Sequence, residues 1–394
     1  MNIENQESKR RIFNHNVENS IGSIFNHGME DAAPKTKQVF NHDLSDCSDE
    51  DELSKLLGVF KYPGRVLGET NPNDIIQLHP DLNDGWKWIT SHYDKIGLSH
   101  TKNVIWDDNF NIVENFLGYE LSVFFFGSKA HSARPNKKWF DLAEKMNSKN
   151  SFMALCHDLS IDVPKTDCFE NVNQFCGCNG TKFPVYLKIS TSVSGLGVIK
   201  CEDESELEKE ISLIEPEVDF QIQEEVEAKT FINVQYVAYD KYLKRVAITE
   251  QILEECQYAG SRSTNDYENV WEITDQIAMK MQQEGMRGYF AFDLAVTEDG
   301  KYLAIECNPR YNGSTYPTNI AKKLGIGSWV AKNFETNITT FDNLNLEGIE
   351  YDSSRKSGVI VVNWGCISDR KIGVLIAGNQ DEQNRIEEKL KTFI

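Results

Sequence analysis

Long apolar runs and positive charge are both scarce in this sequence. No stretch approaches the roughly 18 consecutive apolar residues that a membrane-spanning helix needs, and the first residues, MNIENQESKRR, lack the apolar core of a secretory signal. The 41 Lys and Arg residues are outnumbered by 61 Asp and Glu residues, so the formal net charge is −20. This surplus of negative charge disfavours binding along a nucleic-acid backbone. We therefore expect a cytoplasmic protein that binds neither nucleic acid nor membrane.

Cysteine clusters and several familiar catalytic motifs are also missing. The nine cysteines are scattered, and Cys176 and Cys178 have no second pair at the spacing of a zinc site, so we expect reduced thiols. No Gly-Lys-Ser/Thr opens a helix as in a P-loop, and no G-x-S-x-G elbow occurs. The string S-G-L-G lacks the third glycine of a dinucleotide fingerprint. These absences disfavour P-loop nucleotidases, serine hydrolases and dinucleotide-dependent oxidoreductases.

The first 52 residues are polar and contain a short repeat. The triplet F-N-H occurs at 13–15, 25–27 and 40–42, and the acidic run DLSDCSDEDE follows the third copy. No apolar period supports a core here, so we predict a tail that is disordered or docks in extended form. The repeats are interpreted in three ways: as a duplicated linker, as a docking motif for a partner or for the protein's own surface, or as weak metal binding by His15, His27 and His42.

The remaining sequence is long enough for two or three packed subdomains. Residues 53–138 alternate short apolar runs with Gly, Pro and Asn, which is typical of a small α/β subdomain. A helical pattern follows from Trp139 to Leu159, and a second helix is predicted after Asp203. We predict a small subdomain over 139–227 and a large one over 228–394, which ends in a strand–strand–helix piece (Gly358–Ile394).

The segment YFAFDLAVTEDGKYLAIECN predicts a hairpin with a two-residue turn at Asp299-Gly300. With that turn Asp293 faces Glu306 on one side of the sheet, with Cβ atoms about 4.5–5.5 Å apart, while Ile305 lies on the opposite side. Two carboxylates so close require a shared proton or a cation. Together with Asn308 they form an all-oxygen ligand set that suits Mg²⁺ or Mn²⁺. The alternative is a solvated face whose charges alternate by chance.

A second polar feature lies in FPVYLKISTSVSGLGVIKC. Val185 and Ile189 alternate with Lys188, which therefore points away from the aliphatic side of the strand. The stretch 190–197 supplies small residues whose backbone N–H groups can approach phosphate oxygens. Taken alone, this stretch is equally well an ordinary hairpin turn.

The order of these parts resembles the ATP-grasp superfamily. Lys188 with a Ser/Gly loop, a strand ending QEEVEA, and then Asp293 followed by Glu306-Cys-Asn308-Pro-Arg310 occur in the same succession over roughly 140–330. The resemblance implies a mixed fold of α+β or α/β class, in which two subdomains clamp ATP behind an N-terminal α/β (pre-ATP-grasp) subdomain. Such enzymes join a carboxylate to an amine through an acyl phosphate and release ADP and phosphate.

The resemblance also implies roles for individual residues. Asp293, Glu306 and Asn308 are implied to hold Mg²⁺ or Mn²⁺, and Arg310 and Lys188 are implied to be catalytic, with Arg310 steadying phosphate or the tetrahedral intermediate. The residues implied to bind ATP are Lys149, Lys188, Ser194, Gly195, Gly197, Gln223, Glu224 and Val226.

Two places depart from the pattern of the superfamily. Gln223 and Thr230 stand where many members have glutamates, which leaves the ribose contacts open. Arg245 and Arg262 stand where a cation for substrate or phosphate is often found.

The C-terminal stretch VIVVNWGCISDRKIGVLIAGNQDEQNRIEEKL is similar to the tail of pheganomycin-type peptide ligases. This similarity favours an amino-acid or peptide ligase with a small-molecule carboxylate and a small-molecule amine as substrates. The alternatives are an ATP-binding module without turnover that recruits partners through its tail, and an ATP-grasp small-molecule kinase. Docking through the F-N-H tail, to a partner or within the protein, and a homodimer are left open.

Overall fold

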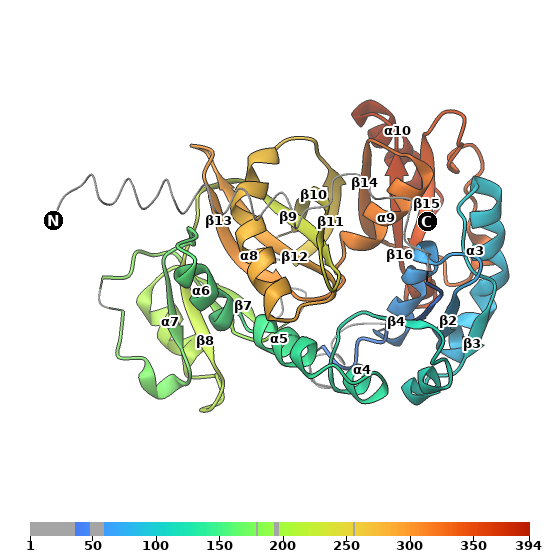
Figure 1. The fold of residues 1–394 in the computed structure, drawn as a ribbon. Coiled ribbons are helices and arrows are strands. Elements are labelled where there is room, and N and C mark those ends of the chain that lie inside the picture. Colours follow the sequence, from blue (N-terminus) through green and yellow to red (C-terminus); the bar gives the residue numbers. More distant parts are fainter. Residues whose placement is uncertain (1–35, 48–58, 179, 193–196, 255–256) are drawn as a thin grey trace, which may run out of the picture.

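The computed structural model describes residues 36–47, 59–178, 180–192, 197–254 and 257–394. Three sheets follow one another along the molecule (Figure 1). The N-terminal sheet and the sheet of the small subdomain lie at opposite ends, and an eight-stranded sheet lies between them. None of the helices in the described ranges combines the length and the apolar character that a bilayer crossing requires.

The N-terminal subdomain contains a parallel sheet in the order β3-β2-β1-β4. Its strands are β1 (Gln38–Asn41), β2 (Ile75–Leu78), β3 (Val104–Trp106) and β4 (Glu120–Val123). Its helices are η1 (Val59–Glu69), η2 (Pro80–Leu82), α3 (Asn83–Ile96), η3 (Phe110–Asn115) and α4 (Ser128–Ala133). An α/β subdomain is what the sequence predicted for this region.

Strand β1 lies within the stretch that the sequence predicted to be a tail. It contains Phe40 and Asn41 of the third F-N-H repeat with the two residues before them, and it pairs with both β2 and β4 in the middle of the sheet. Val39 and Phe40 are buried because a central strand is covered on both faces. Residues 38–41 therefore dock in extended form, which is one of the alternatives that the sequence left open for the tail; their polar neighbours and the shortness of the strand hid its period. The subdomain boundaries stay predictions.

The helical pattern at 139–159 forms two helices instead of one. Helix α5 (Lys137–Asn147) ends at Ser148, which caps the next helix, α6 (Lys149–Asp158), by accepting a hydrogen bond from the backbone N–H of Ser151 at 3.2 Å. The Ser148 hydroxyl also pairs with that of Ser190 at 2.8 Å. Because Ser and similar residues favour helix starts over helix interiors, the chain bends here and places Lys149 in the first turn of α6.

The small subdomain contains a four-stranded antiparallel sheet in the order β5-β8-β6-β7. Its strands are β5 (Thr166–Phe169), β6 (Val185–Ile189), β7 (Val198–Cys201) and β8 (Phe220–Glu224), with a short η4 (Val172–Gln174). The helix predicted after Asp203 is confirmed as α7 (Glu204–Ile211), because the Asp203 carboxylate accepts the N–H of Glu206 at 3.0 Å.

The large sheet is antiparallel, in the order β13-β12-β9-β10-β11-β14-β16-β15. Its strands are β9 (Ala228–Ala238), β10 (Leu243–Glu254), β11 (Gln257–Ser263), β12 (Gly288–Thr297), β13 (Tyr302–Asn308), β14 (Trp329–Glu335), β15 (Gly358–Asn363) and β16 (Lys371–Ala377). The helices of this region are η5 (Glu268–Val270), α8 (Trp271–Glu284), α9 (Thr315–Leu324), η6 (Phe341–Asn343), η7 (Gly365–Asp369) and α10 (Gln380–Lys391).

The predicted strand–strand–helix piece at the C-terminus is confirmed as β15, β16 and α10. Its strands extend the large sheet and share one hydrophobic core with the N-terminal subdomain. Tyr93 donates to the carbonyl of Val361 at 3.0 Å, and the Trp364 indole donates to the carbonyl of Gly64 at 2.7 Å. The N-terminal subdomain and the C-terminal strands are therefore held together beside one wall of the cavity described below (Figure 1).

Candidate active site

The β12–β13 hairpin brings the two predicted carboxylates face to face. Asp293 pairs with Glu306, as the sequence predicted. The turn differs, because Thr297 and Lys301 close a three-residue loop in which Gly300 has φ +81°. A bulge between Asp293 and Leu294 then shifts the register by one residue. The loop and the bulge compensate each other, so the pairing at the site agrees with the prediction although the turn does not.

The bulge also corrects the predicted side of Ile305. Leu294 pairs with Ala304, which leaves Ile305 as the extra residue of β13. Leu294 and Ala304 lie in the core under the sheet, whereas Ile305 lines the cavity above it. Ile305 therefore offers an apolar surface on the same side as Glu306.

Asp293 lies between amides that the sequence did not single out. Its neighbour on the other side is Asn233 of β9, whose Nδ2 donates to Asp293 Oδ1 at 2.6 Å, while Asn308 Nδ2 donates to Oδ2 at 2.9 Å. Gln251 of β10 also hydrogen-bonds to this carboxyl. Asn233 and Gln251 could not be found from sequence, because only the strand order of the sheet places them beside β12.

The two carboxyls have different proton affinities. Burial, and after it the charge of Glu306, raises the pKa of Asp293 to about 7. Burial would also raise the pKa of Glu306, but the charges of Lys149, Arg310 and Lys188 lower it below its ordinary value. Near neutral pH Glu306 is therefore ionised, while Asp293 exchanges a proton with the solvent. Two facing carboxyls without a cation between them are expected to share a proton in this way.

Lys149 lies directly beside this pair. Its Nζ is 3.6 Å from Glu306 Oε2 and donates to Ser192 Oγ at 2.9 Å. Its backbone N–H donates to the carbonyl of Ser190 at 2.8 Å, which ties α6 to the end of β6. Lys149 is only 6% exposed, so its charge acts in a medium of low dielectric constant.

Lys188 of β6 and the neighbouring strand β8 form the other side of the site. Lys188 Nζ donates to Gln223 Oε1 at 2.6 Å, and Gln223 Nε2 donates to Thr166 Oγ1 at 2.9 Å. Gln223, Glu224 and Val226 line the cavity at the link between the small and large sheets, where the sequence predicted the adenine contacts. Phe231 and Ala228 line it as well, and Thr230 is outside the lining.

Arg310 continues the polar face of β13 and is 9% exposed. Its guanidinium donates to Asn147 Oδ1 at 2.6 Å, and Asn147 Nδ2 donates to the carbonyl of Cys47 at 3.4 Å. The last residue of α5 thus connects Arg310 to the segment that follows β1. Asn147 gave no signal in the sequence because it contacts the site only after the chain bends at Ser148.

A second arginine, Arg65 of η1, faces the same cavity from the N-terminal subdomain. Its guanidinium carbon lies 4.3 Å from the ring centre of Tyr316, 5.3 Å from that of Phe124 and 5.4 Å from that of Tyr62. Its Nε is buried and has no hydrogen-bond partner, and among the described residues no carboxylate is ion-paired with it. A partly buried cation of this kind is suited to an anionic group of a ligand.

The carboxylates of Asp293 and Glu306 and the cations of Lys149, Lys188, Arg310 and Arg65 line one cavity of about 750 Å³. The cavity runs from the small sheet, past Asp293 and Glu306, to Asn333 and Lys371 on β14 and β16. In the described ranges no group of three or more His, Cys, Asp or Glu side chains is arranged around a metal position. The predicted metal set contains only two carboxylates and an amide, so substrate phosphates and water would have to complete the coordination.

Several predicted residues are not part of this arrangement. Ser194 and Gly195 lie outside the described residues. Gly197 is described and has φ +70°, a conformation that favours glycine, and its carbonyl accepts the N–H of Ile189 at 2.9 Å. It closes the β6–β7 turn and is outside the cavity lining.

The two other arginines considered from sequence have structural partners. Arg245 forms an ion pair with Asp275 and lies over the ring of Trp271, and Arg262 lies 3.9 Å from Glu250. Neither lines the cavity. The structure therefore does not bring either of them to the cavity that contains Asp293 and Glu306.

His42 is also excluded as a metal ligand. Its Nδ1 pairs with the Tyr316 hydroxyl at 2.9 Å and its Nε2 with the Ser122 hydroxyl at 3.1 Å, so both ring nitrogens are occupied. Burial, and after it the charge of Arg65, lowers the pKa of His42 well below its ordinary value. His15 and His27 lie outside the described residues.

Residues 146–314 match the sequence family described as an ATP-grasp domain. This range begins beside Lys149 and ends beyond Arg310, so it includes Asp293, Glu306, Asn308, both lysines and Arg310, whereas Arg65, Asn333 and Lys371 lie outside it. The chain contains an ATP-grasp domain. Its mixed α/β architecture, with a parallel N-terminal sheet and antiparallel sheets behind it, confirms the predicted fold class.

Solved structures of similar fold cover nearly the whole chain. N5-carboxyaminoimidazole synthetase from Staphylococcus aureus complexed with ADP has a TM-score of 0.60 at 10% identity, over 92% of this chain and 99% of that one. An L-amino acid ligase from Bacillus licheniformis has a TM-score of 0.52 at 11% identity, over 92% and 98%. Carboxyaminoimidazole ribonucleotide synthase from Aspergillus clavatus, complexed with ATP, has a TM-score of 0.52 at 9% identity, over 81% and 98%. At these identities the likeness concerns the fold alone.

Proposed function

We propose that this ATP-grasp protein is an ADP-forming ligase that joins the carboxylate of an amino acid or peptide to an amine through an acyl phosphate. The observation that carries the proposal is the grouping of Asp293 and Glu306, opposed across one hairpin, with Lys149 at 3.6 Å from Glu306. Two facing carboxylates, one of them beside a lysine, can bind a divalent cation together with the phosphate groups of a nucleotide.

The residues of the hairpin fit Mg²⁺ or Mn²⁺. Asp293 and Glu306 offer carboxylate oxygens, and Asn308, which donates to Asp293 through its nitrogen, has a carbonyl oxygen to offer. A divalent ion bound there with ATP would neutralise charge on the β- and γ-phosphates. The proton associated with the raised pKa of Asp293 would leave as the ion arrives, since a metal ligand must be deprotonated.

The remaining side chains divide the chemistry among them. The substrate carboxylate attacks the γ-phosphorus of ATP, and its O–P bond forms as the bond to ADP breaks. Lys149 and Lys188 balance the charge of the phosphates. Arg310, held by Asn147, would stabilise the oxyanion when the amine attacks the acyl phosphate and phosphate leaves. The cavity must exclude water during this step, because hydrolysis would destroy the acyl phosphate.

The intact polar set supports turnover over a purely binding role. A module that only binds nucleotide has no need for two opposed carboxylates, a buried lysine and a buried arginine in one cavity. The length of that cavity, from the small sheet to β16, together with the similarity of the C-terminal segment to peptide ligases, supports amino-acid or peptide substrates over smaller ones.

The test is an ADP-release screen over amino acids and short peptides, with mass spectrometry of the products. We expect Mg²⁺-dependent ADP release that requires two substrates and yields an amide. A stable phosphorylated product would identify a kinase instead. Specific ATP binding with no substrate-stimulated ADP release across the screen would favour the non-catalytic module.

A further inference from the structure

The segment that contains the third F-N-H repeat is a docked strand in which nearly every side chain has a defined role. Val39 and Phe40 are buried in two cores. Asn41 Nδ2 donates to Gln77 Oε1 at 3.0 Å, and His42 pairs with Tyr316 and Ser122. The position between β2 and β4, together with the turn after it, therefore selects particular residues. We refer to this position, filled by Gln38–Cys47, as the β1 slot.

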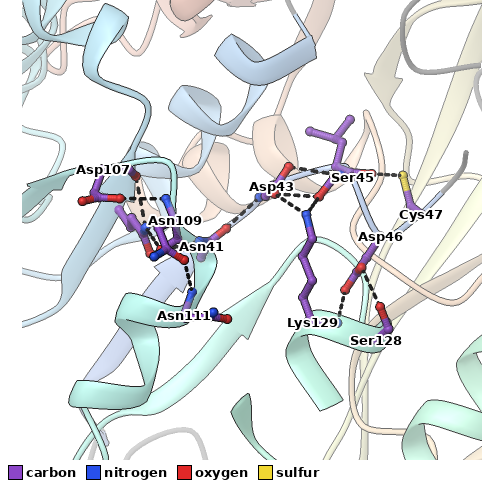
Figure 2. A network of polar contacts seen from close by, with 12 residues as sticks. Asn41, Asp43, Ser45, Asp46, Cys47, Asp107, Asn109, Asn111, Ser128 and Lys129 are labelled. Carbon is purple, nitrogen blue, oxygen red and sulfur yellow. Dashed lines mark hydrogen bonds and ion pairs between the residues drawn. The ribbon is translucent and has the colours of Figure 1, made fainter. Parts of the chain in front are cut away.

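The turn after β1 is held by charge as well as by packing (Figure 2). Asp46 accepts the backbone N–H of Lys129 at 2.7 Å and the hydroxyl of Ser128 at 3.1 Å. The Lys129 ammonium lies 3.5 Å from Asp43 Oδ2 and contacts the hydroxyl of Ser45. The slot thus needs one acidic group facing Lys129 and one acceptor facing the start of α4.

The two upstream repeats carry matching residues at these positions. Where the slot holds V-F-N-H-D-L-S-D-C (39–47), the sequence has I-F-N-H-G-M-E-D-A at 24–32 and I-F-N-H-N-V-E-N-S at 12–20. The buried apolar residues, the Asn and the His are kept. Asp43 corresponds to Gly28 or Asn16, but Ser45 corresponds to Glu30 or Glu18, so each upstream repeat still carries a carboxylate that could serve Lys129 if the repeat filled the slot. A linker without a docking role has no reason to preserve this set.

We propose that the upstream repeats are alternative first strands, each able to replace Gln38–Cys47 in the β1 slot of the same chain. The occupant is thus residues 23–32 or 11–20 of this protein. The connection from the slot to Val59 consists of residues 48–58 for the third repeat, 33–58 for the second and 21–58 for the first. The entropy of closing the longer loop lowers the occupancy of the slot only about fourfold for the second repeat and about sixfold for the first. A segment of the same chain also has a high effective concentration near the slot compared with a second molecule.

The exchange changes the substrate cavity. Leu44 and Cys47 line it, and both Arg310 and Arg65 lie close enough to Cys47 for their charges to act on its thiol. Repeat 2 would place Met29 and Ala32 at these two positions, and repeat 1 would place Val17 and Ser20. The backbone carbonyl that binds Asn147 would be kept in each case. The same chain would therefore line this cavity with three different pairs of side chains, while the hydrogen bonds that position Arg310 stay the same.

The first experiment uses the full-length protein and three variants: Phe40→Asp, the control Phe13→Asp/Phe25→Asp, and the triple variant Phe13→Asp/Phe25→Asp/Phe40→Asp. We expect Phe40→Asp to unfold within about 3 °C of wild type, because the longer loop costs little and the replacing repeat keeps the Phe, Asn and His of the slot, and the control to match wild type. The triple variant should lose its cooperative transition. Hydrogen exchange should show amide protection at 24–27 in Phe40→Asp in place of 39–42.

Two results would overturn the proposal. One is a Phe40→Asp protein as unstable as the triple variant, without protection at 24–27. The other is protection that appears only in a concentration-dependent dimer, which would make a second copy the source of the strand. As a further check, residues 23–32 are copied in place of 38–47 in the Phe13→Asp/Phe25→Asp background, with a scrambled copy as control. Failure of the copied repeat to fold would show that the slot rejects it.

Discussion

Lys149 Nζ lies 3.6 Å from Glu306 Oε2 and joins the first turn of α6 to strand β13. This contact places a buried cation against one of two opposed carboxylates and leaves the other, Asp293, to the amides of Asn233 and Asn308. The asymmetry explains why the pKa of Glu306 is lowered while that of Asp293 is raised. The predictions below follow from this arrangement.

Lys149→Met should reduce kcat/KM for ATP by at least about 100-fold, which corresponds to about 2.7 kcal/mol of lost transition-state stabilisation. The physical reason is that a buried charge beside the phosphates acts at low dielectric constant. Steady-state ADP release measures the effect, and Lys137→Met, on the exposed surface of α5, is the matched control. An equal loss in both variants would refute the assignment of Lys149.

Glu306→Gln and Asp293→Asn should each abolish ADP release with little change in the fold. Each removes a carboxylate that the proposed Mg²⁺ site requires, and neither creates a cavity. Circular dichroism and thermal unfolding establish that the variants are folded. Near-normal turnover of either variant at saturating Mg²⁺ would show that the metal assignment is wrong.

The stability of the protein without divalent ions should depend on pH through Asp293. The carboxyl titrates near 3.8 when unperturbed and near 7 in the folded protein, so the folded state holds the proton more tightly. The contribution of the Asp293 proton to the free energy of unfolding is fully present below about pH 4 and is lost as pH rises through 7. Each unit of pKa shift corresponds to about 1.4 kcal/mol of that free energy.

This dependence can be measured as Tm from pH 4 to pH 8 without metal. We expect the fall in Tm to be smaller in Asp293→Asn, and Mg²⁺ with ATP to restore wild-type stability at pH 8 by binding the ionised pair. Identical pH profiles for the two proteins would contradict the raised pKa.

Asn147→Ala should lower kcat by about 10-fold or more while leaving KM for ATP nearly unchanged. Asn147 is outside the cavity lining, but it holds the guanidinium of Arg310 at 2.6 Å, and a group that stabilises an oxyanion must be positioned before the reaction. Asn147→Asp keeps an acceptor for Arg310 but loses the donor to the Cys47 carbonyl, so it should recover part of the rate. If Asn147→Ala and Asn147→Asp lose equal activity, Asn147 does not act by positioning Arg310.

Arg65→Met should raise KM for a carboxylate-bearing substrate by at least about 10-fold and leave KM for ATP unchanged. Its Nε is buried without a hydrogen-bond partner and its side chain lines the cavity, so a carboxylate of the substrate would supply the missing acceptor. An increase in KM for ATP alone would place Arg65 in the nucleotide site instead.

The sequence by itself determined which side chains share the polar face of the hairpin. Alternation along β12 and β13 places Asp293 opposite Glu306 and continues through Asn308 and Arg310, because side chains two apart in a strand point the same way. Similarly, the N-cap at Asp203 and the C-terminal strand pair could be predicted, since local patterns define them. Even here the agreement at Asp293 depended on a loop and a bulge that compensate each other.

Only the tertiary structure decided which distant elements complete the site. Asn233 reaches Asp293 through the order of the strands, Lys149 through the bend at Ser148, and Arg65 through the packing of η1 against α9. The third F-N-H repeat became a central strand for the same reason, because β2 and β4 supply its partners. The local periodicity of a sequence shows which face of a helix or strand is polar. Which element lies against that face depends on long-range packing, and long-range packing produces no periodic pattern in the sequence.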